Sequence, residues 1–233
     1  MEVQIGVAKI NKYASSESGD TLEVVERPNG GLSVVLADGQ RSGKSAKLIS
    51  NMVVRKVISL LAEGVRDGAA ARAASDYLYT HRNGKVQSTL NILSIDMETR
   101  TVVITRNNPN PSLVSINGVT KAMSEESQPV GLRRGTRPVI TELNLLSGLI
   151  VAMYTDGLPF AGDRRGTPLD IRARFERLVQ SDATPQGMAD NLMAEALNLE
   201  QDRPGDDISI VVLGVLPRGS DDVRRMWARL PLS

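Results

Sequence analysis

The segment from Leu32 to Ala46, L-S-V-V-L-A-D-G-Q-R-S-G-K-S-A, decides the fold. Its first half is a nearly continuous apolar run, rich in β-branched residues and too short for a helix, which is typical of a strand buried on both faces. The run ends at Asp38-Gly39, and helical spacing begins near Lys44. We therefore expect a carboxylate at the edge of the core, followed by a glycine that lets backbone or ligand come close.

The same pattern occurs again later in the chain. Leu149–Tyr154 is an apolar run followed by Thr155-Asp156-Gly157, and Asp206-Asp207 directly precedes the apolar run 208–216. A fourth acidic position, Asp20, follows Gly19 in a polar loop. Apolar strands of this kind lie side by side in the middle of a sheet, so we expect the carboxylates at their ends to converge.

Composition restricts the class of protein. The chain has 233 residues, of which 41% are hydrophobic and 24% are charged, with a net charge of +1, 3% aromatic residues and no cysteine. Near-neutral charge and few aromatic residues argue against a nucleic-acid or membrane partner, and the lack of cysteine excludes disulfides and Cys-ligated zinc. With no leader and no long apolar stretch, we expect a cytoplasmic protein without a membrane span, of open oligomeric state.

Strand and helix patterns alternate along one domain, 1–233, of the α+β class. Turn signals predict hairpins that join neighbouring strands, at 21–26 with 32–37, 89–95 with 100–105, 112–116 with 119–123, and 139–145 with 149–154. Helical spacing is predicted at 44–62, 67–79, 169–179 and 185–199. A last amphipathic helix over Ser220–Arg229, in the tail 220–233, would pack with Val223, Met226, Trp227 and Leu230 on its apolar side.

The separated acidic residues suit a metal site of oxygen ligands. Unpaired carboxylates that converge repel one another, and a divalent cation relieves that repulsion. An all-oxygen set selects magnesium or manganese, and the one histidine, His81, cannot build an imidazole site. Two ions that share a bridging aspartate would generate hydroxide and hold a phosphate in line. The alternative is that each Asp-Gly is only a turn dipeptide and that the other acids lie in solvated loops.

A second alternative lies in the opening segment itself. Gly39–Ser45 follows a strand, begins a helix and nearly forms a P-loop, but only three residues separate its glycines where that motif has four. P-loop folds also need a parallel sheet, whereas this chain offers several hairpins. A P-loop nucleotide hydrolase is therefore the weaker hypothesis.

The order of five motifs resembles the metal-dependent PPM protein serine/threonine phosphatases, and within them the small stand-alone members of the bacterial SpoIIE-type branch. These motifs are S-G-D-T (18–21), A-D-G-x-x-S-G (37–43), Q-P-V-G-L (128–132), Y-T-D-G-L (154–158) and D-D-I-S (206–209). The resemblance implies an αββα sandwich, in which two antiparallel sheets face one another with helices outside. It also implies hydrolysis of phosphoserine or phosphothreonine by direct attack of metal-bound water.

The resemblance also implies roles for single residues. Asp38 would bridge two Mn²⁺ or Mg²⁺ ions, the Gly39 carbonyl would help to hold one of them, and Asp156 and Asp206 would bind the other. Asp20 would lie near the second metal, and Asp207 would support the site. The implied partner is a small phosphorylated regulator of the anti-anti-sigma (STAS) type. A catalytically silent PPM-fold module that binds a regulator is the alternative.

Four basic residues have open roles. Arg41 stands where the resembled family usually has glycine, and it either contacts substrate phosphate or is a solvated loop residue. Lys44 is expected at a solvated helix start. Arg164 and Arg165 either belong to a flap that binds the phosphoprotein or simply face solvent. His81 is expected at a helix end on the surface, and Trp227 in the packing of the terminal helix.

Overall fold

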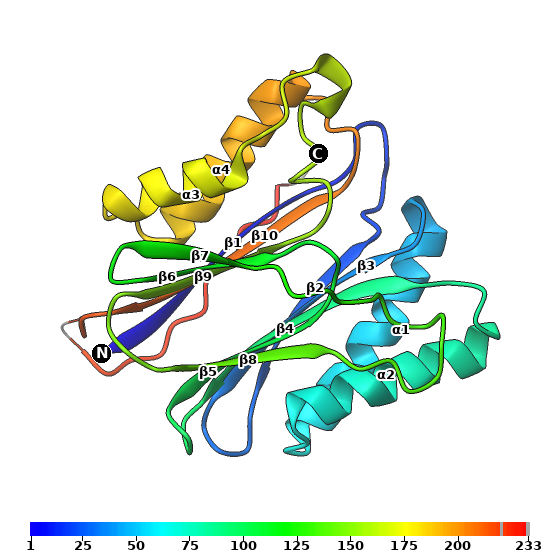
Figure 1. Ribbon diagram of the computed structural model, residues 1–233, viewed down its shortest axis with the longest axis horizontal. Helices are drawn as coiled ribbons and strands as arrows, with labels where there is room; N and C mark the ends of the chain where they lie inside the picture. Colours follow the sequence, from blue (N-terminus) through cyan, green and yellow to red (C-terminus); the bar gives the residue numbers. More distant parts are fainter. Residues whose placement is uncertain (220, 232–233) are drawn as a thin grey trace.

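The computed structural model describes residues 1–219 and 221–231, and within these residues ten strands form two antiparallel five-stranded sheets (Figure 1). Sheet A has the strand order β1-β10-β9-β6-β7, and sheet B has the order β2-β3-β4-β5-β8. The strands of sheet A are β1 (Glu2–Ile10), β10 (Ile208–Leu216), β9 (Leu149–Tyr154), β6 (Ser112–Ile116) and β7 (Val119–Met123). Those of sheet B are β2 (Asp20–Glu26), β3 (Leu32–Gly39), β4 (Ser88–Asp96), β5 (Thr101–Asn107) and β8 (Val139–Asn144).

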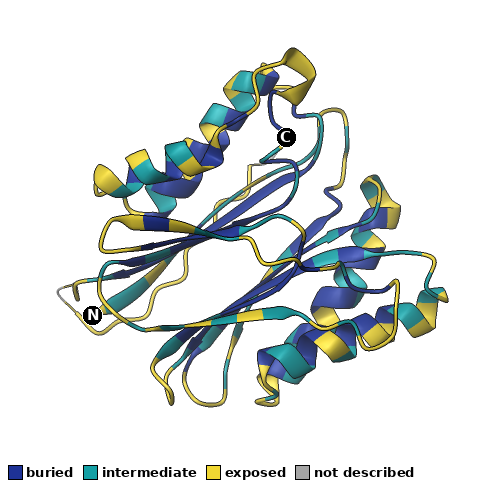
Figure 2. Ribbon diagram, viewed as in Figure 1, coloured by how far each residue is buried: buried dark blue, intermediate teal, exposed yellow. Residues whose placement is uncertain are grey.

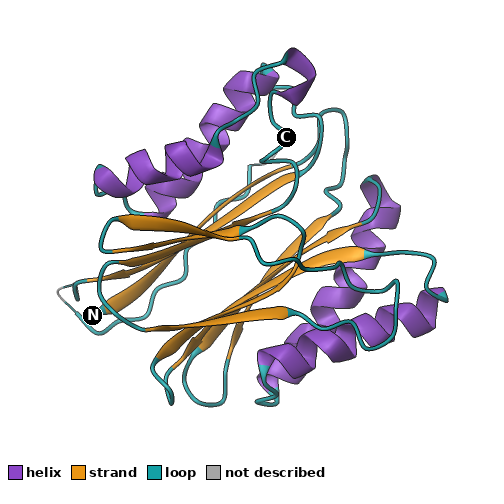
Figure 3. Cartoon of the chain, in the orientation of Figure 1, coloured by secondary structure: helices purple, strands orange, loops and turns teal. Residues whose placement is uncertain are grey.

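Helices cover the outer face of each sheet, which gives four layers (Figure 3). Sheet B carries α1 (Gly43–Ala62) and α2 (Asp67–Arg82), while sheet A carries α3 (Ile171–Gln180) and α4 (Pro185–Glu200). A short 3₁₀ turn, η1 (Asp163–Arg165), precedes α3. The predicted αββα sandwich of the α+β class is confirmed.

Strand β3 is buried on both faces, as the sequence predicts. Val34 and Leu36 point into the core between the sheets, and Val35 and Ala37 pack under α1 and α2. All four side chains are 0% exposed, which follows from the two-residue period of a strand between two apolar layers. Figure 2 shows the buried residues concentrated along the facing sheets. This packing fixes where the end of β3, and hence Asp38, must lie.

One predicted hairpin is wrong. Strands 139–145 and 149–154 do not pair with one another, because β8 pairs with β5 in sheet B and β9 pairs with β6 and β10 in sheet A. The link around Gly148 instead crosses from one sheet to the other. Leu145 N–H donates to the Arg100 carbonyl at 2.9 Å, and Gly148 N–H donates to the Val215 carbonyl at 2.8 Å. Each end is therefore held by its own sheet.

The predicted terminal helix is also wrong for the residues that the structure describes. Residues 221–231 have no regular secondary structure. Met226, Trp227 and Leu230 are 77%, 79% and 81% exposed, so the expected apolar contact is not made. A helix of about ten residues is marginal in water unless a packed face stabilises it. Ser220 lies outside the described residues.

The antiparallel pairing of both sheets does not fit the P-loop alternative, because that fold needs a parallel sheet with crossover connections. None of the helices in the described part of the chain is both long and apolar enough to span a bilayer.

Candidate metal centre

The segments that carry the predicted acids meet at one end of the sandwich. Asp20 begins β2 and lies opposite Asp38, near the end of β3. The end of β9 and the start of β10 are neighbours in sheet A, which places Asp156 and Asp206 together. From the apolar runs of the sequence we expected the strand ends to meet within one sheet. The structure brings them together across two facing sheets.

Glycines allow this convergence by removing side chains where backbones touch. A Cβ on Gly39 would lie 2.0 Å from the carbonyl oxygen of Ala46 in α1, and a Cβ on Gly157 would lie 2.2 Å from that of Asp207. Neither glycine has a positive φ. Both Asp-Gly pairs are therefore sites of close backbone approach. Asp38-Gly39 ends strand β3, which does not fit the turn-dipeptide alternative, whereas Asp156-Gly157 does lie in a turn, in which the Leu158 N–H donates to the Thr155 carbonyl at 3.2 Å.

Asp20 is fully buried and only half satisfied. Its Oδ2 atom accepts hydrogen bonds from Thr155 Oγ1 at 2.9 Å and from Ser209 Oγ at 2.6 Å. Its Oδ1 atom is buried with no hydrogen-bond partner. An unpaired buried carboxylate oxygen costs free energy, so this atom is suited to a cationic ligand.

Asp38 is the electrostatic centre of the cluster. The pKa of its carboxyl is raised to about 9, mainly by burial and in addition by the negative charges of Asp20, Asp156 and Asp206. Three carboxylates from two sheets therefore interact with Asp38. Without a cation, a proton on Asp38 takes the place of the missing positive charge.

Asp156 and Asp206 form the sheet A half of the cluster. Burial raises the pKa of Asp156, and the charge of Asp206 raises it too, whereas a hydrogen bond from the Gly157 backbone opposes that rise. Both residues are partly exposed. They therefore face one another at the open side of the site.

Asp207 has a different role from its neighbour. Its Oδ1 accepts from the Lys12 backbone N–H at 2.9 Å, and its Oδ2 accepts from the Gly19 backbone N–H at 2.8 Å. With both oxygens committed to the backbone, Asp207 holds the loop that presents Asp20. The resemblance implies a supporting role for Asp207, and that role stays a prediction.

Two lysines that the sequence analysis did not single out also hold Asp20. Lys9 Nζ and Lys47 Nζ each donate to the Asp20 carbonyl oxygen at 2.7 Å. Burial lowers the pKa of Lys9, and the neighbouring Lys47 charge lowers it further, while Asp20 and Asp207 oppose that shift. Lys9 and Lys47 could not be identified from the sequence, because they meet Asp20 only through tertiary packing and no short motif links β1 and α1 to β2.

The residues fit a divalent metal centre in the chemistry of their donor atoms. The donor set is all oxygen, Asp20 Oδ1 is unpaired, and the pKa of Asp38 shows excess negative charge. No group of three or more Asp, Glu, His or Cys side chains within 1–219 and 221–231 is arranged so that together they could hold a metal ion. Magnesium typically keeps several waters and takes one or two carboxylates, so the pairs Asp20 with Asp38 and Asp156 with Asp206 suffice as partial shells.

The backbone conformation at Arg41 is one that favours glycine, the residue that the resembled family usually has at this position. Its φ is +79°, in the left-handed region, and its side chain is exposed. A residue with a Cβ is strained there by about 1 kcal/mol. Backbone strain next to a functional site suggests that the strained side chain has a function that offsets its energetic cost. This is consistent with the predicted contact between Arg41 and the substrate phosphate.

The remaining basic candidates and His81 lie as follows. Lys44 is exposed in the first turn of α1. The Arg164 guanidinium packs on Gly205, next to Asp206, where a Cβ would lie 2.8 Å from its Nη1 atom. Arg165 donates instead to the Glu200 carbonyl, and both arginines are exposed. His81 lies in the last turn of α2 on the surface, as expected.

A family model described as Stage II sporulation protein E (SpoIIE) matches residues 28–216. The chain belongs to the SpoIIE family. Stage II sporulation protein E of Bacillus subtilis (strain 168) is 22% identical over 232 residues, which is 99% of this chain but only 27% of that protein. The resemblance to the SpoIIE-type branch is therefore confirmed, and this chain spans about a quarter of that curated relative.

Solved structures agree with SpoIIE membership and confirm the fold. The PP2C phosphatase domain of Bacillus subtilis SpoIIE, solved with a fragment of its regulatory domain, matches with a TM-score of 0.78 at 22% identity, covering 94% of this chain and 64% of that one. RsbX in complex with magnesium matches with a TM-score of 0.68 at 17% identity, covering 91% and 95%.

The first prediction concerns Asp38 in the chelator-treated, metal-free protein. Because its pKa is raised on folding, its contribution to stability is present below the unfolded pKa and is lost as pH rises toward 9. We expect Asp38→Asn to raise the free energy of unfolding by roughly 1–3 kcal/mol at pH 8, with a smaller gain at pH 5. Urea unfolding at both pH values measures this gain.

Asp190→Asn is the matched control, since Asp190 is exposed on α4. It should change stability by less than about 0.5 kcal/mol at either pH. A gain for Asp38→Asn that does not grow with pH would contradict the electrostatic account.

The second prediction separates strain from chemistry at Arg41. Arg41→Gly should stabilise the protein by about 1 kcal/mol, whereas Arg41→Ala keeps the strained backbone and should not. Thermal unfolding distinguishes the two variants. If the Arg41 side chain contacts substrate, both variants should lose the same share of kcat/KM. Equal stability of Arg41→Gly and Arg41→Ala would refute the backbone strain.

Proposed function

We propose that this chain is a metal-dependent phosphatase that hydrolyses phosphoserine or phosphothreonine in a protein. The observation that carries the proposal is the partly buried acidic cluster around Asp38, which gathers Asp20, Asp156 and Asp206 from both sheets of a SpoIIE-family fold. The matching phosphatase domain of Bacillus subtilis SpoIIE supports the same assignment.

The proposed site holds two ions, Mn²⁺ or Mg²⁺. Asp38 would bridge them, Asp20 and the Gly39 carbonyl would lie on one side, and Asp156 with Asp206 on the other. Bound ions would supply an activated water and neutralise the charge of the phosphate. RsbX was solved with magnesium, which supports the choice of cation.

The chain's own residues position this site. Thr155 and Ser209 fix one oxygen of Asp20, so its free Oδ1 has a defined direction. Lys9 and Lys47 hold the Asp20 carbonyl, and Asp207 holds the Gly19 backbone. Preorganised ligands of this kind reduce the reorganisation needed when charge develops in the transition state.

The proposed substrate is a small phosphorylated regulator of the anti-anti-sigma (STAS) type, in the cytoplasm. This part of the proposal rests on the SpoIIE resemblance. The exposed side chain of Arg41, three residues after Asp38 in the sequence, suits a phosphorylated, anionic partner.

The third prediction tests the reaction directly. Hydrolysis of p-nitrophenyl phosphate should depend on added Mn²⁺ and fall by at least about 100-fold in Asp156→Asn, because that change removes a metal ligand. Lys44→Ala should keep the rate within about a factor of two.

The outcomes of this assay separate the hypotheses. Loss of ATP turnover in Lys44→Ala would support a nucleotide hydrolase instead. No turnover of any phosphoester with metal supplied, including a phosphoserine peptide, would favour the catalytically silent binding module.

The fourth prediction concerns the supporting role of Asp207. Asp207→Asn keeps one acceptor oxygen but loses the second backbone hydrogen bond. We expect the Mn²⁺ concentration for half-maximal activity to rise about 10- to 100-fold, with activity recovered at saturating metal. A metal titration measures this shift. The exposed neighbour variant Asp202→Asn should leave the titration unchanged, and an unshifted Asp207→Asn would refute the role.

A further inference from the structure

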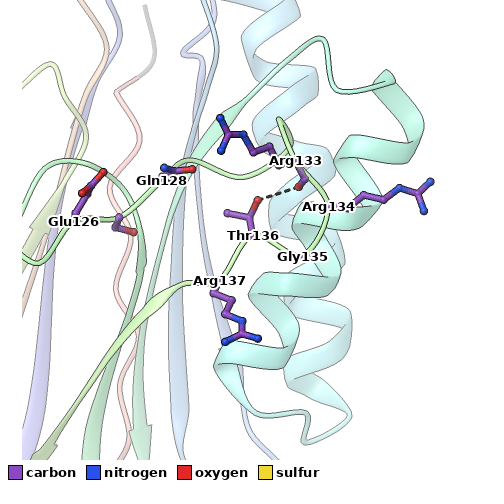
Figure 4. A pocket seen from close by; sticks show the side chains of 8 residues that line it. Glu126, Gln128, Arg133, Arg134, Gly135, Thr136 and Arg137 are labelled. Carbon is purple, nitrogen blue, oxygen red and sulfur yellow. Dashed lines mark hydrogen bonds between the residues drawn. The ribbon is translucent and has the colours of Figure 1, made fainter.

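A polar groove lies beside the acidic cluster. It has a cavity volume of about 420 Å³ and is lined by residues 126–128 on one side and 133–137 on the other (Figure 4). Neither the metal ligands nor Arg41 line it. The groove therefore has no role in the proposed metal chemistry.

The groove is joined to the metal centre by short links. Val130, between its two walls, exchanges backbone hydrogen bonds of 2.9 and 3.1 Å with Ser88 at the start of β4. Ser88 Oγ in turn donates to the Asp38 carbonyl at 2.6 Å. These bonds connect the segment between the two walls to the backbone of Asp38, so we expect a chain that lies in the groove to continue toward the acidic cluster.

The walls of the groove are held by the end of β5. Asn107 Nδ2 lies 3.0 Å from the Gln128 carbonyl and 3.4 Å from the Arg137 carbonyl, and thus reaches both walls. Ser127 Oγ donates to the Arg106 carbonyl at 2.6 Å. The groove is therefore a built feature of the fold rather than a loose surface loop.

The charge of the groove is predominantly positive. Arg133, Arg134 and Arg137 are exposed, and none of them forms an ion pair with a residue that the structure describes. Arg106, only 2% exposed, donates to the carbonyls of Asn108 and Glu125 rather than to a carboxylate. Arg106 shares the face of β5 that points between the sheets, whereas Asn107 reaches the groove walls, so the three surface arginines carry the positive charge of the groove.

The geometry favours an extended acidic ligand over a single phosphate. In Figure 4 the three arginine side chains leave the loop in different directions, with Arg134 pointing away from Glu126. Guanidinium groups pair well with carboxylates. Guanidinium groups that are spread over a surface therefore suit a ligand chain that carries several carboxylates. Glu126 in one wall and the absence of aromatic residues from the lining disfavour nucleic acid.

We propose that this groove binds an acidic segment of the phosphoprotein substrate, next to the phosphorylated residue that enters the metal centre. The inference rests on the proposed phosphatase function and adds to it the charge of the substrate that the protein selects. Small phosphoesters do not reach the groove, so their hydrolysis does not depend on it.

The test compares two phosphoserine peptides of equal length, one with flanking Asp and Glu and one with Asn and Gln. The native protein should have a kcat/KM about 10-fold higher for the acidic peptide, and added NaCl should remove that preference. Arg133→Glu combined with Arg137→Glu should abolish the preference while p-nitrophenyl phosphate hydrolysis is retained. Arg100→Glu, an exposed arginine at the opposite end of sheet B, is the matched control and should keep the preference.

Three outcomes of the hydrolysis assays would overturn the proposal. These are equal rates for the two peptides, an effect of the double variant no larger than that of Arg100→Glu, and loss of p-nitrophenyl phosphate hydrolysis in the double variant. The last would show that the groove shapes the metal centre itself. Tighter binding of an oligonucleotide than of the acidic peptide would also overturn it.

Binding separates this proposal from the proposed function. A fluorescent acidic peptide should bind the native chain more tightly than its neutral counterpart even if no phosphoester is hydrolysed, and the double variant should lose that difference. Selective binding without turnover would support the groove and refute the phosphatase, whereas turnover without selective binding would do the reverse.

Discussion

Repulsion between closely placed carboxylates is the constraint on which the rest of the structure depends. Asp38 lies among Asp20, Asp156 and Asp206, in surroundings where burial already disfavours its charge. A fold that only needed stability would not place four acids there, since hydrophobic residues pack without this cost. A divalent cation would relieve this repulsion, and the position of the cluster at the end of the sandwich leaves Asp156 and Asp206 partly exposed to solvent.

The sandwich meets this constraint by making the strand ends rigid. The core between the sheets is built from alternate residues of β3, β9 and β10, whose other faces pack under the helices. A shift of one residue in any of these strands would exchange its two buried faces. The register of each strand therefore also fixes the place of the acid at its end, so the precision of the site follows from core packing.

Much of this could be predicted from the sequence, because the acids directly adjoin apolar runs. Asp38 and Asp156 were identifiable in this way, and each lies at the shared end of the sandwich. The sheet to which each strand belongs was not predictable, since the turn at Gly148 has the residues of a hairpin but joins the two sheets. Lys9 and Lys47 were missed for a related reason, because their contact with Asp20 exists only after β1, β2 and α1 have packed.

The tail marks a different limit of sequence patterns. Val223, Met226, Trp227 and Leu230 have helical spacing, yet such a period stabilises a helix only where a surface exists to bury it. At the other extreme, the net charge of +1 conceals a separation of charge, with acids buried at the metal centre and arginines exposed around the neighbouring groove. Averages over a sequence lose this arrangement, and it is the arrangement that relates the chain to an anionic substrate.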